Sequence, residues 1–191
     1  ASAALFIGSE EIISALFGYG SFNVDAVSNS AKALYFFSLG LPAFALIKVF
    51  STFFFANNDT KTPFYISLVS VILNILISVY YFKSIGFIII PMATTISSWF
   101  NSILLFFYLK NRNLFELNNI FLIKFLKIVF ASIIMGLFFN FLTQIFENQL
   151  IYDYDLKSLY LVLSVLLSLT FYLLVSFLIK AFNYKDLKLK Y

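Results

Sequence analysis

Long apolar runs separated by short polar connections dominate the pattern of this 191-residue chain. A helix needs about 20 predominantly apolar residues to cross the hydrocarbon core of a bilayer. Lipid favours helices for such runs because each backbone polar group must be bonded within its own segment. The pattern predicts five complete spans, over residues 33–55, 64–83, 85–109, 120–144 and 156–180.

Composition supports a lipid-facing exterior. The chain is 62% hydrophobic and 12% charged, whereas a soluble domain is about 25% charged. So few charges cannot cover a water-exposed surface. The predicted fold class is therefore all-α, a polytopic transmembrane helix bundle.

The N-terminal end indicates a piece of a larger membrane protein. Residues 1–8 are already apolar and carry no initiating Met, and they are expected to be the end of a truncated sixth span. Residues 10–17 follow as a short helix predicted at the membrane interface. Its first turn holds Glu10 and Glu11, which are favourable at the positive end of a helix.

The distribution of Lys and Arg predicts the orientation. Connections 9–32, 83–86 and 145–157 hold three cations, and the opposite side holds nine. The three are Lys32, Lys83 and Lys157; the nine are Lys61, Lys110, Arg112, Lys124, Lys127, Lys180, Lys185, Lys188 and Lys190. The second side is therefore predicted to be cytoplasmic, and the C-terminus with it.

The sequence offers no residues suited to catalysis or to metal binding. The chain has no Cys and no His, and its five predicted spans contain no Asp or Glu. Neither a phosphate-binding glycine loop nor a metal-ligand spacing is present. We therefore expect a protein that is not an enzyme, with no catalytic residue, no metal site, no cofactor and no nucleic-acid partner.

Lys48 is a charged residue well inside the first predicted span. Lys48 is about seven residues from the polar run that starts at Asn57. Its side chain could reach the cytoplasmic interface by snorkelling. It could equally face an aqueous cavity and attract an anionic substrate, so both interpretations stay open.

Two neighbouring spans carry polar stripes. A stripe at four-residue spacing shares one face of a helix, and such faces usually meet other helices. Either interhelical hydrogen bonding or a cation or substrate site would explain the pattern, and the first is the commoner use of small hydroxyl residues. The stripes are Ser70, Asn74 and Ser78 in one span, and Thr94, Ser98 and Asn101 in the next.

Four segments together resemble the C-terminal half of the MurJ (MviN) family of lipid II flippases, in the MOP exporter superfamily. The resemblance covers roughly residues 5–110, and FFFANNDTKTP is its most specific part. The segments read LFGYGSF, YFFSLGLPAFALIKVFSTFFFANNDTKTP, LNILIS and GFIIIPMATTISSWFNSILLFFYL.

The resemblance implies a place for the chain within a 14-helix transporter. Residues 1–110 would hold the end of span 9 through span 12, and residues 111–191 would hold spans 13 and 14 with a cytoplasmic tail. The protein would sit in the bacterial cytoplasmic membrane as a multi-pass protein. It would work with an N-terminal lobe that this sequence lacks.

The resemblance also implies an activity. Such a protein moves lipid II, a polyprenyl-pyrophosphate lipid, between leaflets by alternating access during cell-wall synthesis, with membrane lipids around it. Lys48 matches a family lysine and is the electrostatic candidate in the substrate cavity. Some members are thought to bind sodium, and Asn74 and Thr94 match positions of that site. Ser78 stands where a carboxylate is expected, so sodium coupling is weakened here.

The polar run 57–62 then has an interpretation as a cytoplasmic turn between two cavity-lining helices. Asp59 and Lys61 are predicted to tie off this turn. Thr60 or Thr62 would cap the second helix, and Pro63 lies in its first turn, where a missing N–H costs little. The turn is predicted to hold the two helices together during transport.

Other functions remain as alternatives. One is a flippase for another lipid-linked oligosaccharide or a cation-coupled exporter of the same superfamily. Another is a membrane scaffold that transports nothing. An embedded transferase is disfavoured, because the spans lack acids, His and Cys.

Overall fold

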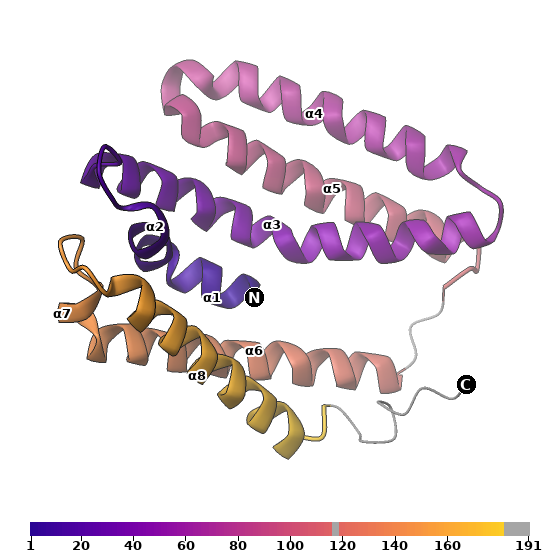
Figure 1. The fold of residues 1–191 in the computed structure, drawn as a ribbon. Coiled ribbons are helices and arrows are strands. Elements are labelled where there is room, and N and C mark those ends of the chain that lie inside the picture. The colour runs from indigo at the N-terminus through magenta and orange to yellow at the C-terminus, as the bar shows by residue number, and fades with distance from the viewer. Residues whose placement is uncertain (116–118, 182–191) are drawn as a thin grey trace. The chain divides into compact units, whose positions relative to one another are not determined.

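The computed structural model describes residues 1–115 and 119–181, and these residues form helices with no strand among them. The predicted cytoplasmic tail lies outside the described residues. Five helices are long: α3 (Val24–Ala56), α4 (Lys61–Ile85), α5 (Ile89–Asn111), α6 (Asn119–Ile145) and α8 (Lys157–Leu178). Four are short: α1 (Ser2–Ile7), α2 (Ser9–Phe17), the 3₁₀ helix η1 (Gly86–Ile88) and α7 (Glu147–Leu150) (Figure 1).

The long helices confirm the predicted all-α bundle. Four stretches are long and apolar enough to cross a membrane, namely Val24–Ala56, Lys61–Asn111, Phe121–Ile145 and Lys157–Leu178. The second has 51 residues and comprises α4, η1 and α5. The chain reverses between α4 and α5 at Gly86, whose φ of 77° suits glycine.

α3 begins nine residues before the predicted span, at Val24. Hydropathy marks only the part of a helix that lies in lipid, and residues 24–32 are too polar to register. The helix start is capped by Asn23, whose Oδ1 accepts a hydrogen bond from the Ala26 N–H at 2.9 Å.

The described chain divides into two compact units. One comprises residues 29–115, with most of α3 and all of α4 and α5; the other comprises residues 3–28 with 119–181. The N-terminal helices α1 and α2 thus group with α6, α7 and α8. The assignment of residues 1–110 and 111–191 to numbered spans stays a prediction.

In the unit of residues 29–115, α4 and α5 form an antiparallel hairpin (Figure 1). α3 packs on α5 through Gly40, where an added Cβ would lie 3.0 Å from Thr95 Oγ1. Thr95 Oγ1 donates to the Phe36 carbonyl at 2.7 Å, and Trp99 Nε1 donates to the Leu39 carbonyl at 3.0 Å. One end of the three helices closes on an apolar cluster of Phe50, Phe54, Ile66, Leu105 and Leu109.

In the other unit, α6 and α8 pack along each other, with the Phe138 and Phe171 rings stacked at 4.2 Å. α1 approaches α6 closely, because a Cβ at Gly8 would lie 2.2 Å from the Phe139 ring. Gly136 on α6 is equally tight against Ile7. Small residues at such points let membrane helices approach closely.

Lys157, counted as a cation of the connection 145–157, is buried. It is the first residue of α8 and only 1% exposed. Its Nζ donates to the carbonyls of Gly18 and Tyr152 at 2.6 and 2.5 Å. The ammonium also lies 4.2 Å from the Tyr19 ring centroid and 4.5 Å from that of Tyr152.

The two carbonyls and two tyrosine rings around the Lys157 ammonium join the end of α2 to the loop before α8. The carbonyls and ring faces replace the water that a buried ammonium loses. Ser158 adds a second link, since its Oγ donates to the Ala15 carbonyl at 2.7 Å and bonds with the Tyr19 hydroxyl at 2.6 Å. No local sequence pattern predicts these bonds, because Lys157 and Gly18 are 139 positions apart.

Replacing Lys157 with Met should destabilise the full-length protein. Met fills the space of the stem but leaves two buried carbonyls without a donor, which costs about 1–3 kcal/mol per group. Thermal unfolding in detergent would measure the loss. Lys83→Met, at an exposed position, is the matched control. Equal unfolding temperatures for the two variants would contradict this role.

Candidate functional site

The polar stripe of α4 lies against α5. Asn74 Nδ2 donates to Thr94 Oγ1 at 3.1 Å and to Ser97 Oγ at 3.2 Å. Ser78 Oγ donates to Asn74 Oδ1 at 3.4 Å. The structure therefore brings together the three residues Asn74, Ser78 and Thr94 that the sequence singled out.

The hydroxyl groups of the stripes mostly donate to their own helices. Ser70 Oγ donates to the Ile66 carbonyl at 2.8 Å, Thr94 Oγ1 to Ile90 at 2.8 Å and Ser98 Oγ to Thr94 at 2.6 Å. Each oxygen keeps lone pairs that can accept a further hydrogen bond. The interface thus offers mainly acceptors, and the Asn74 amide supplies two donor bonds to them.

A groove of about 350 Å³ opens along this interface. Its lining comes from α3, α4 and α5 and includes no charged side chain: Phe44, Ile47, Ser67, Ser70, Val71, Asn74, Ile75, Thr94, Ser97, Ser98 and Asn101. We call this the α3–α5 groove.

Asn101 is the groove's least satisfied residue. It is 7% exposed, and its Oδ1 has no hydrogen-bond partner. Its Nδ2 donates to Ser67 Oγ at a long 3.4 Å. A buried carbonyl oxygen in this state is a ready acceptor for a ligand or water. The α3–α5 groove can thus hold a hydrated or hydroxyl-bearing group within an apolar bundle.

Lys48 does not line the α3–α5 groove. It is exposed on α3, one helical turn after Phe44, which does line it. Four-residue spacing places Lys48 and Phe44 on similar faces of α3. Its predicted role in a substrate cavity stays a prediction.

The turn between α3 and α4 is bonded to the end of α5 through Asp59. Asp59 pairs with Arg112 at the end of α5, and no bond or ion pair joins it to Lys61 within the described residues. Lys61, the first residue of α4, is exposed. Arg112 also donates to Thr62 Oγ1 at 3.2 Å. The turn is thus tied to a third helix.

Asp59 also caps α4. Its Oδ1 accepts the Thr62 N–H at 3.0 Å, and its Oδ2 accepts the Thr62 hydroxyl at 2.7 Å. Thr60, one of the two threonines predicted to cap α4, takes the N-cap position, but its side chain makes no capping hydrogen bond. Pro63 lies in the first turn of α4 as predicted, and it is buried.

These bonds lower the pKa of Asp59 from 3.8 to about 2. The Thr62 hydroxyl contributes most, then the Thr62 N–H, and the Arg112 guanidinium adds to both. Each stabilises the ionised carboxylate. Asp59 therefore stays charged in any physiological medium.

Three residues of these sites escaped prediction. Ser67 and Ser97 lie three positions from Ser70 and Thr94, and the i+3 spacing could have added them to the faces found by i+4 spacing. Arg112 offers no such signal, because 53 positions separate it from Asp59.

Within the described residues, no three His, Cys, Asp or Glu side chains are grouped to hold a metal ion. Long apolar helices enclosing an uncharged polar groove define a multi-span α-helical membrane protein. The family described as lipid II flippase MurJ matches residues 1–161. The chain therefore belongs to the lipid II flippase MurJ family.

Curated relatives of this chain carry the same family description. The probable lipid II flippase MurJ of Rickettsia prowazekii is 29% identical over 187 residues, which is 97% of this chain and 37% of that protein. That of Thermotoga maritima is 32% identical over 149 residues, covering 78% and 30%. The lipid II flippase MurJ of Burkholderia cenocepacia is 29% identical over 133 residues, covering 70% and 26%. The chain thus spans about a third of the length of these relatives.

The lowered pKa of Asp59 can be tested through the pH dependence of stability. A carboxylate with a lowered folded pKa contributes stability above its ordinary pKa of 3.8 and loses it as pH falls toward about 2. The difference in unfolding temperature between full-length wild type and Asp59→Asn should therefore be constant from about pH 8 to 5. It should shrink only in stronger acid.

Asp153→Asn is the control, at an exposed loop position. A difference for Asp59→Asn that already collapses near neutral pH would show that the pKa of Asp59 is not lowered.

Proposed function

We propose that this chain is the part of a lipid II flippase that carries the α3–α5 groove. The observation that carries the proposal is the family match over residues 1–161, which includes every helix that lines the groove. The lipid would move from the inner to the outer leaflet of the bacterial cytoplasmic membrane. The rest of the protein would supply the opposing wall in an alternating-access cycle.

The physical need for such a protein is clear. A pyrophosphate-bearing headgroup cannot enter hydrocarbon unaided, since burying unpaired charge costs far more than a hydrogen bond. A path lined by uncharged oxygens and amides can keep water around that headgroup while the lipid tail stays in the bilayer. The α3–α5 groove supports this role because seven of its eleven lining residues carry uncharged polar side chains.

Lys48 is proposed as the electrostatic contact for the pyrophosphate. It stands one turn from the groove wall at Phe44, and it is exposed. An exposed ammonium inside an apolar span lacks the water that a loop lysine has, so an anionic lipid group is a favourable partner.

The orientation follows as part of the proposal. Lys61, Lys110 and Arg112 lie together at the ends of α4 and α5 in the described chain, and such clusters mark the cytoplasmic side. The turn at Asp59 would then face the cytoplasm. Its bonds to Arg112 and Thr62 support a role in holding α3, α4 and α5 as one body during transport.

Complementation tests both the function and Lys48. Full-length protein should restore growth to a bacterium depleted of its own lipid II flippase. Lys48→Ala should lower or abolish rescue, and Lys48→Arg should keep it, because charge is what the pyrophosphate requires. Lys83→Ala is the control for loss of an exposed lysine.

Protein levels in the membrane would be measured for every variant. Wild-type protein that reaches the membrane but supports no growth would contradict the flippase proposal. Full rescue by Lys48→Ala at normal levels would contradict the role of Lys48 alone.

A further inference from the structure

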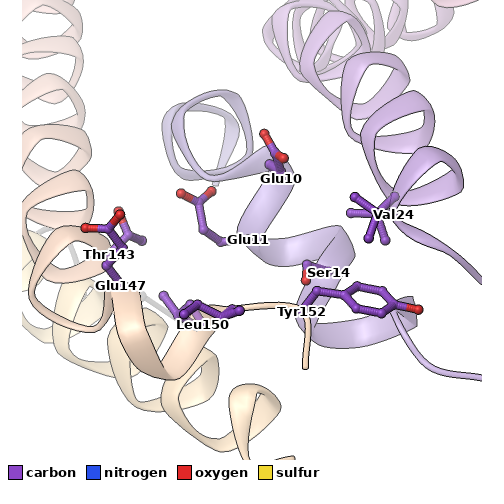
Figure 2. A pocket seen from close by; sticks show the side chains of 10 residues that line it. Glu10, Glu11, Ser14, Val24, Thr143, Glu147, Leu150 and Tyr152 are labelled. Atoms are coloured by element: carbon purple, nitrogen blue, oxygen red, sulfur yellow. The ribbon is translucent and has the colours of Figure 1, made fainter. Parts of the chain in front are cut away.

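A second cavity lies in the other unit of the chain, outside the α3–α5 groove. Its volume is about 260 Å³. It is lined by α2, the start of α3, the end of α6, α7 and the loop that follows: Glu10, Glu11, Ser14, Val24, Val27, Thr143, Glu147, Leu150, Ile151 and Tyr152. Figure 2 shows this cavity, which we call the α2–α7 cavity.

The charges on its wall are all negative. Glu10 and Glu11 come from the first turn of α2, and Glu147 is the first residue of α7. In Figure 2, Glu11 and Glu147 stand on two sides of the cavity. No Lys or Arg lines it, and no ion pair reaches these three acids within the described residues. The wall of the cavity is therefore anionic.

The pKa of Glu11 reflects this arrangement of acids. Burial raises the pKa of its carboxyl above the ordinary 4.5, a backbone hydrogen bond offsets part of that rise, and the neighbouring charge of Glu10 raises the pKa further. The two effects that raise the pKa disfavour the ionised form unless a positive charge arrives. A bound cation would relieve them.

Ser14 supplies an independent sign of a ligand. It is 6% exposed, it lines the cavity, and its hydroxyl has no hydrogen-bond partner in the described chain. Two other buried helix serines, Ser70 and Ser164, donate to a carbonyl four residues earlier, whereas Ser176 on α8 has no partner. Figure 2 shows Ser14 between Glu11 and Tyr152. A hydroxyl without a hydrogen-bond partner at this place can bond with a ligand.

The lining indicates the chemistry of that partner. Within the described residues no three His, Cys, Asp or Glu side chains are grouped to hold a metal ion, so an organic cation fits the acidic wall better than a metal. The remaining wall is apolar, with Val24, Val27, Leu150 and Ile151. Thr143 is 6% exposed, and its hydroxyl donates to the Asn140 carbonyl at 2.9 Å, which leaves its lone pairs to accept an N–H.

We propose that the α2–α7 cavity binds a primary ammonium group carried on a short aliphatic chain. The carboxylates of Glu11 and Glu147 receive the ammonium, the hydroxyl of Ser14 bonds with it, and the valine and leucine side chains pack on the methylenes. The proposal stands apart from the flippase function, since none of its residues lines the α3–α5 groove.

Lys157 is a positioning residue for this cavity. It holds the Tyr152 carbonyl, and Tyr152 forms part of the wall. The Tyr152 hydroxyl donates to the Phe22 carbonyl at 2.7 Å, which fixes the other end of the side chain. The wall is therefore set before any ligand binds.

Calorimetric titration of full-length protein with 1,5-diaminopentane tests the proposal. The protein would sit in nanodiscs of phosphatidylcholine and phosphatidylglycerol, which contain no primary amine. Saturable binding is expected. 1,5-Pentanediol has the same length without charge and should not bind, and Mg²⁺ should not compete. This comparison uses wild-type protein alone, so it does not depend on the folding of any variant.

Variants then locate the site. Glu11→Gln and Glu147→Gln should each weaken binding about tenfold, because each removes a charge-assisted hydrogen bond. Asp155→Asn removes a charge from an exposed position in the same region and should leave binding unchanged. Absence of saturable diamine binding, equal binding of the diol, or unchanged binding in both glutamate variants would overturn the proposal.

The ammonium could come from a soluble amine or from an ethanolamine phospholipid headgroup, and one further arm separates them. Nanodiscs containing phosphatidylethanolamine should raise the apparent Kd of the diamine if the lipid headgroup occupies the cavity. An unchanged Kd identifies a soluble amine as the ligand. Either result supports an ammonium site once the diamine itself has bound.

Discussion

The need to satisfy every polar group without water governs this structure. In hydrocarbon an unpaired backbone or side-chain group costs several kcal/mol, so the chain forms long helices, and its hydroxyls donate to their own backbone. Ser70, Thr94 and Ser98 all do so. Asn101 and Ser14 do not, and each lines a cavity. Gln149 Oε1 and Ser176 Oγ are also buried without a partner, and neither residue lines these cavities.

Two charged groups show how differently this constraint acts at different depths. Asp59 lies in a polar turn and is stabilised as an anion by Thr62 and Arg112. Lys157 is almost fully buried, and it relies on two carbonyls and two tyrosine rings in place of a counter-ion. Both connect segments distant in the sequence. Each therefore fixes the end of a helix bundle whose apolar faces alone would permit sliding.

The sequence could predict what local periodicity encodes. Hydropathy located all five long helices, and four-residue spacing brought Asn74 and Thr94 to one interface. Hydropathy could not locate the early start of α3, because a polar helix outside lipid has the composition of a loop. Partners 53 and 139 positions apart, as for Asp59 and Lys157, also leave no local pattern. The α2–α7 cavity depends on the same long-range packing.

Cysteine cross-linking in native membranes would test the polar α4–α5 interface most directly. The sequence has no Cys, so Asn74→Cys with Thr94→Cys introduces a defined pair, once any cysteine elsewhere in the full-length protein is replaced. Mild oxidation should join this pair rapidly. Leu76→Cys with Ile103→Cys, at positions 62% and 48% exposed, should stay reduced. Equal cross-linking of both pairs, or none at Asn74 and Thr94, would contradict the interface on which the groove depends.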